Sequence, residues 1–484
     1  MKRFRKGSEY LEDLRDGRNV LFEGTRVDNV AEHSAFRGGA GTIASLIDLH
    51  HREDLEDRML SYCEEDGREF STSYLIPKSL EELRKKGSCF REIAKVTGGM
   101  MARTPDFLAT LLASWNAASE VFGRKRGEYA ENIKRYYSHS MERNLVHSHA
   151  ISDPPMDRFF DLPGDRKLTL RKVGETKDGI LVSGIKMLAT LAPISDELII
   201  YPFRPLKASD GSEALAFAIP IGTEGLKLLC RSGIATGDRE FDRPLSEKFD
   251  EMDSLCIFED VLVPHERVFI DGDVQFANEL RSETGMVSYV SHQTCSRTAV
   301  KGEFMLGLAS LLARFSGRGQ QSAIQQILGE MAANAEILRS LLVAAESEGE
   351  TDRFGNFVPC QTALGASNAV ASQFYTRSVE ILRCIGASGL IMHPTEYDLS
   401  EKMDQEILKY FGMSGEDAFT HIKVLKIASD LVVNSFGGRQ ILYEQFYLGA
   451  PQAVQTRFFQ SYPRLKDAEL LVEKIFVPPR VPSF

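Results

Sequence analysis

The chain has 484 residues, a formal net charge of −11 at pH 7, 43% hydrophobic residues and 26% charged residues. This length suits two or three domains rather than one small core, and the composition is that of an ordinary globular protein. The acidic balance argues against a nucleic-acid-binding or anionic-membrane-binding surface, because such surfaces need clustered positive charge.

The first part of the chain, residues 1–150, predicts an N-terminal helical domain. Apolar residues recur at helical spacing over 104–122, where Thr104 is a plausible N-cap. A second helix is expected over 126–148, with His149 directly after it. This helix must end before the double proline that follows, because proline cannot donate a backbone hydrogen bond.

One segment of this part matches a nucleotide-binding pattern. Residues 38–44 (GGAGTIA) have the G-x-G-x-x-A spacing of a dinucleotide-binding loop. Such a loop must follow a buried strand, whereas the preceding residues are mostly polar. We therefore interpret the segment as a flexible loop before a helix, and we expect no NAD(P)H site in the chain.

Residues 151–275 predict a middle antiparallel β-domain. Short apolar runs alternate with Gly, Pro, Asp or Ser, and no helix-length segment separates them, which favours antiparallel connections. The expected strands cover residues 167–173, 180–185, 197–203, 214–221, 226–230 and 254–264.

Residues 276–484 predict a C-terminal helical bundle with an aromatic-rich tail. Helix–sheet–helix order predicts an α+β multidomain protein whose bundle packs against the β-domain. The long helices are expected over residues 287–317, 320–348, 361–389 and 415–435, and residues 347–357 are expected to form a loop.

The seven cysteines and the N-terminal residues bear on the cellular location of the protein. No pair of cysteines has C-x-x-C spacing, and an odd, dispersed set predicts reduced thiols in a cytoplasmic protein. The basic N-terminus is followed by acidic residues rather than by an apolar run, and no run approaches the ~18 apolar residues of a membrane span. We therefore expect neither a signal peptide nor a membrane anchor.

Three residues are candidates for chemistry. Arg103 precedes a helix start, where its guanidinium and the free N–H groups would both favour an anion, although a solvated surface arginine is the simpler alternative. His149 is explained equally well as a helix cap, whereas a lone histidine in a buried helix, such as His292, is usually a satisfied core residue. His147 and His149 lack nearby cysteine partners, so we expect no metal site.

Longer strings carry more information than these single residues. They include GSEYLEDLRDGRNVLFEG (7–24), RTPDF (103–107), SHAISDPPMDR (148–158), FDEMDSLCIFEDVLVPHERVF (249–269) and SFGGRQILYEQFY (435–447). Together, and in this order, they resemble the 4-hydroxyphenylacetate 3-hydroxylase family, the FAD-dependent oxygenase components of two-component aromatic hydroxylases. The resemblance covers essentially the whole chain. It implies an acyl-CoA dehydrogenase-like fold, a homotetramer, and FAD bound between the β-domain and the bundle.

The resemblance also implies roles for residues by position. Arg103, Phe107 and His149 match substrate-binding positions, and Arg103 and His149 match residues that contact the phenolic oxygen. His292 matches a histidine that halophenol-hydroxylating relatives use near the substrate hydroxyl. Many 4-hydroxyphenylacetate enzymes have tyrosine at position 107, so phenylalanine deletes a hydroxyl and leaves the native phenol open. The flavin-binding positions implied are His149, Ala150, Ile151, Ser152, Pro155, Met156, Asp157, Arg158, Thr190, Asn434, Ser435, Phe436, Gly437 and Arg439.

The activity implied is that of a monooxygenase that hydroxylates a phenol with O₂ and reduced FAD through a flavin C4a-hydroperoxide. A separate flavin reductase would supply reduced FAD by diffusion, which agrees with the missing NAD(P)H site. A phenolate attacks an electrophilic oxygen far better than a phenol, whose pKa is about 10. A cationic arginine favours the phenolate and a neutral histidine can accept its proton. Arg103 is the expected cation, and His149 or His292 the expected base.

Two other flavoprotein activities are alternatives within the same fold. A 4-hydroxybutyryl-CoA dehydratase needs thiolates for an iron–sulfur cluster, and its pattern places two cysteines around the segment occupied here by Gly99–Arg103, where this chain has none. An acyl-CoA dehydrogenase needs a catalytic carboxylate in the bundle, and the sequence does not rank Glu303, Glu330 and Glu401.

Overall fold

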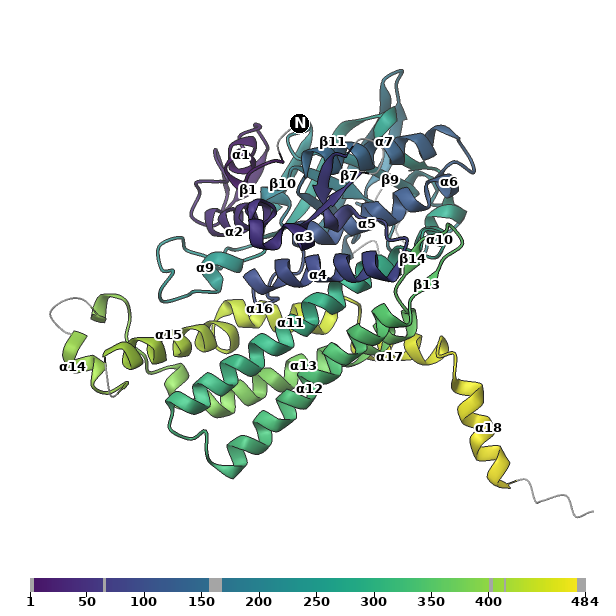
Figure 1. Ribbon diagram of the computed structural model, residues 1–484. Helices are drawn as coiled ribbons and strands as arrows, with labels where there is room; N and C mark the ends of the chain where they lie inside the picture. The colour runs from purple at the N-terminus through teal and green to yellow at the C-terminus, as the bar shows by residue number, and fades with distance from the viewer. Residues whose placement is uncertain (1–3, 64–66, 156–167, 400–403, 413–414, 477–484) are drawn as a thin grey trace, which may run out of the picture.

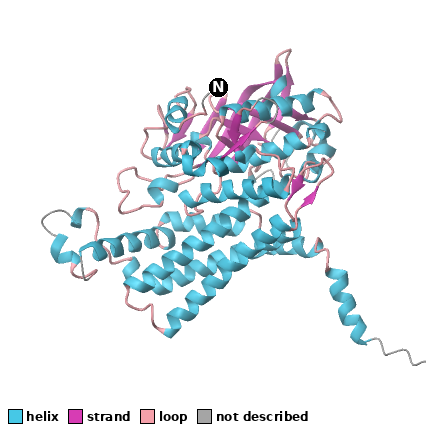
Figure 2. Ribbon diagram, viewed as in Figure 1, coloured by secondary structure: helices cyan, strands magenta, loops and turns pink. Residues whose placement is uncertain are grey.

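The computed structural model describes residues 4–63, 67–155, 168–399, 404–412 and 415–476. Two sheets lie on one side of the molecule and the long C-terminal helices form a bundle on the other, with helices α4 (Leu80–Val96) and α5 (Pro105–Ala117) between them (Figures 1 and 2). This arrangement confirms the predicted α+β class, in which helical N-terminal and C-terminal regions flank a sheet region along the chain.

The larger sheet has six strands in the order β2-β1-β10-β11-β7-β6, and the smaller has the order β12-β9-β8-β5. All neighbouring pairs are antiparallel except β1–β10 and β5–β8, so the predicted antiparallel character is confirmed. The strands are β1 (Val20–Phe22), β2 (Thr25–Arg26), β5 (His147–Ala150), β6 (Arg171–Glu175), β7 (Gly179–Thr190), β8 (Glu197–Ile200), β9 (Leu215–Pro220), β10 (Leu226–Cys230), β11 (Asp253–Pro264) and β12 (Val268–Asp271).

The predicted helix over 126–148 is wrong at its C-terminal end. Helix α7 spans Glu128–Arg143 and stops at Asn144, whose φ of 46° lies in the left-handed region that asparagine tolerates. The next residues form β5, which pairs with β8. His149 therefore lies in a strand and does not cap a helix. Strands β1, β2 and β5 belong to the two sheets although all three precede residue 151.

The glycine-rich segment 38–44 is helical, so the expected loop is wrong. It belongs to α2 (Arg37–Asp48), which packs against α9 (Ser246–Phe249). A Cβ atom on Gly38 would lie 1.6 Å from the carbonyl oxygen of Glu247, so only glycine permits this close approach. The glycines serve helix packing here.

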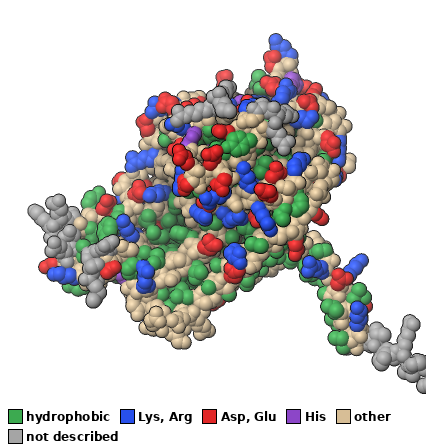
Figure 3. Space-filling model, viewed as in Figure 1, with side chains coloured by type: hydrophobic (Ala, Val, Ile, Leu, Met, Phe, Trp, Pro, Cys, Tyr) green, Lys and Arg blue, Asp and Glu red, His purple; other side chains and the backbone are tan. Residues whose placement is uncertain are grey.

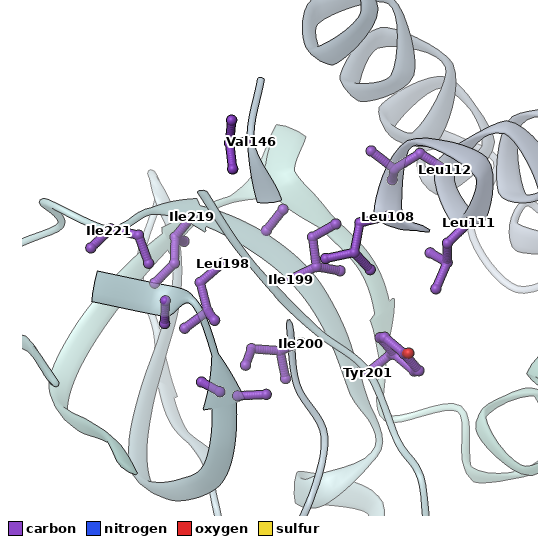
Figure 4. Packing of buried hydrophobic residues seen from close by; sticks show 14 of the residues in the cluster. Leu108, Leu111, Leu112, Val146, Leu198, Ile199, Ile200, Tyr201, Ile219 and Ile221 are labelled. Atoms are coloured by element: carbon purple, nitrogen blue, oxygen red, sulfur yellow. The ribbon is translucent and has the colours of Figure 1, made fainter. Parts of the chain in front are cut away.

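One part of the main core lies between α5 and the smaller sheet. The predicted helix over 104–122 bends at Ala118 and continues as α6 (Ser119–Phe122). Its apolar face is buried as the spacing predicted, and Figure 4 shows Leu108 and Leu111 of α5 beside Ile199 and Tyr201 of the β8 segment. This packing holds α5 and β5 together, because β5 is the neighbour of β8.

The four long C-terminal helices are confirmed to within a few residues. The bundle region contains α10 (Val274–Glu283), α11 (Met286–Phe315), α12 (Ser322–Ser347), α13 (Gln361–Gly386), α15 (Gly415–Val432), α16 (Ser435–Phe446), α17 (Pro451–Gln460) and α18 (Leu465–Phe476), which projects away from the body of the molecule (Figure 1). The shorter elements are α1 (Gly7–Asp13), α3 (Glu56–Met59), α14 (Asp404–Leu408), β3 (Leu60–Tyr62), β4 (Glu69–Ser71), and the pair β13 (Glu350–Thr351) and β14 (Phe357–Val358) within the predicted loop. None of the helices in the described ranges combines the length and apolar character that crossing a bilayer requires.

Candidate active site

The turn before α5, residues 99–103, is held by buried side chains from two bundle helices. Arg297 of α11 donates a hydrogen bond to the carbonyl oxygen of Gly99 at 3.0 Å. Gln440 of α16 donates to the carbonyl oxygen of Met100 at 2.9 Å. Both donors are fully buried, so the turn is fixed against the bundle.

A third side chain reaches the same turn from the segment before β11. Oε1 of Glu251 accepts hydrogen bonds from the backbone N–H groups of Ala102 and Arg103, at 2.7 Å each. Glu251 is fully buried, and its Oε2 lies 3.5 Å from Nη1 of Arg439. The backbone of Arg103 is therefore positioned by a carboxylate that also contacts one of the residues expected to bind flavin.

The guanidinium of Arg103 is half-buried and stacks on aromatic rings. Its Cζ lies 4.2 Å from the ring centroid of Phe107 and 5.6 Å from that of Tyr443. Within the described part of the chain it has no carboxylate partner, although burying a charge without one is costly. An unpaired guanidinium beside the start of α5 favours an anionic ligand.

His149 lies beside Phe107, with the two ring centroids 5.8 Å apart. Its Nδ1 is 2.8 Å from the hydroxyl of Tyr201, the residue that follows β8. Burial, and secondarily the charge of Arg103, hold the pKa of His149 well below its usual 6.5, so its imidazole is neutral at pH 7. The structure thus brings Arg103, Phe107 and His149 together.

The same structure sets His292 apart from this group. Its Nε2 lies 3.1 Å from Oε1 of Glu346 in α12, and its ring meets Phe90 of α4 edge-on. Among the described residues, none of its contacts is shared with Arg103 or His149. His292 belongs to a buried polar cluster between helices, in which Glu346 also pairs with Arg91.

Two of the expected flavin residues meet at a partly buried carboxylate. Thr190 donates to Oδ1 of Asp253 at 2.7 Å, and Arg439 donates to both oxygens of Asp253, at 2.9 and 3.0 Å. Burial opposes the charged form of Asp253, but the guanidiniums of Arg439 and Arg231 hold its pKa below the ordinary value. Asp253 therefore joins β7 to α16 across the boundary between sheet and bundle.

The expected flavin segment Asn434–Gly437 forms the beginning of α16. Asn434 is the N-cap but makes no side-chain cap bond, which leaves the first N–H groups of the helix available to an anion. The buried hydroxyl of Tyr443, one helical turn beyond Arg439, has no hydrogen-bond partner among the described residues. Free N–H groups, an orphaned hydroxyl and a nearby cation fit a flavin nucleotide.

The remaining expected positions lie along the chain after His149. Ala150 is buried, Ile151 is half-buried, and the carbonyl oxygen of Ser152 accepts from the N–H of Met187 at 2.9 Å. Pro155 is exposed. Met156, Asp157 and Arg158 lie outside the described residues.

Sequence reasoning missed four residues of this site: Tyr201, Glu251, Asp253 and Tyr443. Tyr201 ends an apolar run and Tyr443 lies in a helix, so both look like ordinary core residues. Glu251 and Asp253 stand two apart where β11 begins, and this acidic pair was the one available signal. Nothing in its spacing shows that Glu251 binds a turn 148 residues earlier in the chain, at Arg103, or that Asp253 contacts Thr190 and Arg439.

Known proteins match this chain over nearly its whole length. The family model for the N-terminal part of 4-hydroxyphenylacetate 3-hydroxylase matches residues 6–270, and the model for its C-terminal part matches residues 277–476. The chain is 35% identical over 474 residues to the oxygenase component of 4-hydroxyphenylacetate 3-monooxygenase from Thermus thermophilus, with 97% of this chain and 96% of the relative covered.

Solved structures agree with this match. The oxygenase component of 4-hydroxyphenylacetate 3-monooxygenase complexed with FAD and 4-hydroxyphenylacetate superimposes with a TM-score of 0.90 at 34% identity, covering 97% of this chain and 98% of that one. An archaeal 4-hydroxybutyryl-CoA dehydratase from N. maritimus has a TM-score of 0.86 at 21% identity, covering 98% and 95%. At that identity the second likeness shows the fold alone.

Proposed function

The chain belongs to the 4-hydroxyphenylacetate 3-hydroxylase family, and from this we propose that it is the FAD-dependent oxygenase component of a two-component monooxygenase that hydroxylates a phenol. O₂ supplies the oxygen atom and a separate flavin reductase supplies the reduced FAD.

One observation carries the proposal to this chain's own residues. The half-buried guanidinium of Arg103 stacks on Phe107 without a carboxylate partner in the described ranges, and it lies near the neutral imidazole of His149. A cation beside a neutral base is what a phenol needs in order to bind as its phenolate.

The residues that would hold FAD are those that meet at the boundary between sheet and bundle. They are Thr190 and Arg439, joined by Asp253, the helix start Asn434–Gly437, and the stretch from His149. Bound FAD in its reduced form supplies the electrons that activate O₂. Glu251 links this region to the turn that carries Arg103.

Arg103 and His149 have different roles toward the phenol: Arg103 stabilises its anion and His149 accepts its proton. The charge of Arg103 stabilises the phenolate, and lowering a pKa of about 10 by about three units needs ~4 kcal/mol of preferential stabilisation. In the tautomer in which Nδ1–H of His149 donates to the oxygen of Tyr201, Nε2 is the nitrogen that can accept the phenolic proton. A bound phenolate offsets the charge of Arg103 and so removes the smaller of the two causes that lower the pKa of His149, burial being the larger. The ring carbon ortho to the oxygen is then rich enough in electrons to take up oxygen.

The test uses the purified chain, FAD, NADH and an unrelated flavin reductase with a panel of phenols. We expect a catechol from at least one phenol, and no product when the reductase is omitted. Product and H₂O₂ are measured together, since wasted O₂ appears as H₂O₂. Turnover with NADH and no reductase, or H₂O₂ alone with every phenol, would contradict the proposal.

We also infer a cytoplasmic homotetramer. All seven cysteines are free thiols. Large apolar side chains are exposed on α12, α16, α17 and α18, including Leu442 and Ile475, and Figure 3 shows hydrophobic side chains spread over the bundle half of the molecule. Extensive exposed apolar surface marks an interface between subunits. Light scattering on the purified chain measures the mass, and a monomer at micromolar concentration would contradict the inference.

A further inference from the structure

The guanidinium of Arg103 contacts two aromatic side chains, Phe107 and Tyr443, of which only Tyr443 carries a hydroxyl. This hydroxyl is buried and has no hydrogen-bond partner among the described residues. A buried hydroxyl without a partner destabilises a fold, so phenylalanine would serve the packing at position 443 better. The hydroxyl of Tyr443 is therefore available to an acceptor on a ligand.

Bound flavin and bound phenol could each supply this acceptor. Arg439, one of the expected flavin residues, lies 5.5 Å from the ring centroid of Tyr443, about as close as Arg103 at 5.6 Å. The two guanidiniums differ in their partners, because Arg439 binds both oxygens of Asp253 whereas Arg103 has no carboxylate partner in the described ranges. The unpaired guanidinium and the unpartnered hydroxyl thus lie on the same side of this choice, and one anionic oxygen can satisfy both.

The hydroxyl of Tyr443 can donate to a phenolate without losing its own proton. Burial raises the pKa of Tyr443 to about 12, and the charge of Arg103, which lowers it, is the next largest influence. A phenol has a pKa of about 10, so it ionises before Tyr443 does. A phenol bound beside His149 and Arg103 therefore gives its proton to the imidazole, and the O–H of Tyr443 remains a donor to the anion.

We propose that Tyr443 is a further catalytic residue, whose hydroxyl donates a hydrogen bond to the phenolate oxygen that Arg103 holds. It supplies beside Arg103 the hydroxyl that Phe107 lacks. A donor that is fixed before the anion forms stabilises that anion without reorganisation. This inference rests on the proposed function and adds a residue to its phenol site.

The test is Tyr443→Phe, which removes one oxygen atom and keeps the ring beside Arg103. The value of kcat/KM for a phenol that the wild-type chain hydroxylates, such as 4-hydroxyphenylacetate, should fall about 10- to 100-fold, because a hydrogen bond to a charged group is lost. The thermal stability of the ligand-free variant should stay the same or rise, since the hydroxyl has no partner in the described residues. In the Arg103→Met background the same change should have a smaller effect, because both residues hold one oxygen.

Tyr447→Phe is the matched control. Tyr447 stacks on Tyr443, with ring centroids 5.2 Å apart and planes 5° apart, and its hydroxyl is also buried without a partner among the described residues. Its ring contacts Arg297 rather than Arg103, so kcat/KM should stay at the wild-type value. A wild-type kcat/KM in Tyr443→Phe, or an equal fall in both variants, would overturn the inference.

Calorimetric titration with FAD distinguishes the phenol from the flavin as the acceptor. We expect Tyr443→Phe and the wild-type chain to bind oxidised FAD with equal affinity. Weaker FAD binding in the variant would show that the hydroxyl of Tyr443 contacts the flavin, and it would overturn the inference. A wild-type chain that hydroxylates no phenol would instead contradict the proposed function.

Discussion

Oε1 of Glu251 lies 2.7 Å from the backbone nitrogen of Arg103, although the two residues are 148 positions apart. The same oxygen accepts from the N–H of Ala102, so one carboxylate oxygen fixes two successive peptide groups. A cation can stabilise a phenolate only where its own position is fixed before the ligand arrives. Glu251 is therefore a positioning residue for Arg103.

Replacing Glu251 with glutamine should destabilise the protein by about 1.5–3 kcal/mol, because hydrogen bonds to a buried charged acceptor are weakened. The KM for the phenol should rise as well, since the turn at 102–103 loosens. Thermal denaturation and steady-state kinetics measure the two effects. The control is Glu259→Gln, an exposed glutamate paired with Lys227, and an equal change in both variants would contradict the role of Glu251.

Arg103→Met should leave O₂ consumption by reduced flavin intact but lower hydroxylation by about 100-fold, the size of effect seen when one oxyanion-stabilising donor is removed. The missing product should appear as H₂O₂. The loss of hydroxylation should be smaller for a fluorinated phenol, because its lower pKa means that its phenolate needs less stabilisation by a cation. Arg15→Met, at an exposed arginine, is the control, and wild-type coupling in Arg103→Met would show that Arg103 does not hold the phenolate.

Tyr201→Phe removes the hydroxyl that bonds Nδ1 of His149. The buried imidazole then lacks a partner that fixes its tautomer, so we expect kcat/KM to fall about 10-fold. The pH profile of kcat/KM should change shape, which a purely structural loss would not cause. Tyr410→Phe, at a tyrosine that is 88% exposed, is the control. An unaltered pH profile would show that Tyr201 does not orient the base.

Asp253→Asn should weaken FAD binding about 10-fold or more, because Asp253 orients Thr190 and Arg439 through charge-assisted bonds. Calorimetric titration of the purified protein with FAD measures this directly and does not depend on turnover. Asp57→Asn changes an exposed aspartate and should leave the affinity unaltered. Equal affinity in Asp253→Asn and the wild-type chain would place the flavin elsewhere.

Burial lowers the pKa of His147 from 6.5 to about 4. Below pH 6.5 the unfolded chain binds a proton there that the folded chain does not, so the free energy of unfolding falls as the pH drops from about 6.5 toward 4. One such group contributes up to 1.36 kcal/mol per pH unit, or about 3 kcal/mol over the window. Denaturant unfolding between pH 7 and 5, above the range in which most carboxylates titrate, should give a shallower slope for His147→Gln. His51→Gln, at an exposed histidine, should keep the wild-type slope.

The sequence alone determined the elements whose evidence is local. Apolar residues at helical spacing predicted the buried face of α5, including Leu108 and Leu111, because a helix brings residues three and four apart onto one face. Short apolar runs predicted the strands β6 to β11 for a similar reason, but not β1, β2, β5 and β12. The strings around Arg103 and His149 also led to the family, and thus to the phenol and the flavin.

Only the tertiary structure decided how these parts meet. The polar tetrapeptide of β5 is a strand because β8, about 50 residues later, offers it a parallel partner, as in the pairing of His149 with Ile199. Glu251 reaches Arg103, and His292 turns toward Glu346 instead, through packing between elements far apart in sequence. Such contacts depend on how whole helices and sheets bury their apolar faces against one another. The spacing of residues that are close in sequence does not predict this packing.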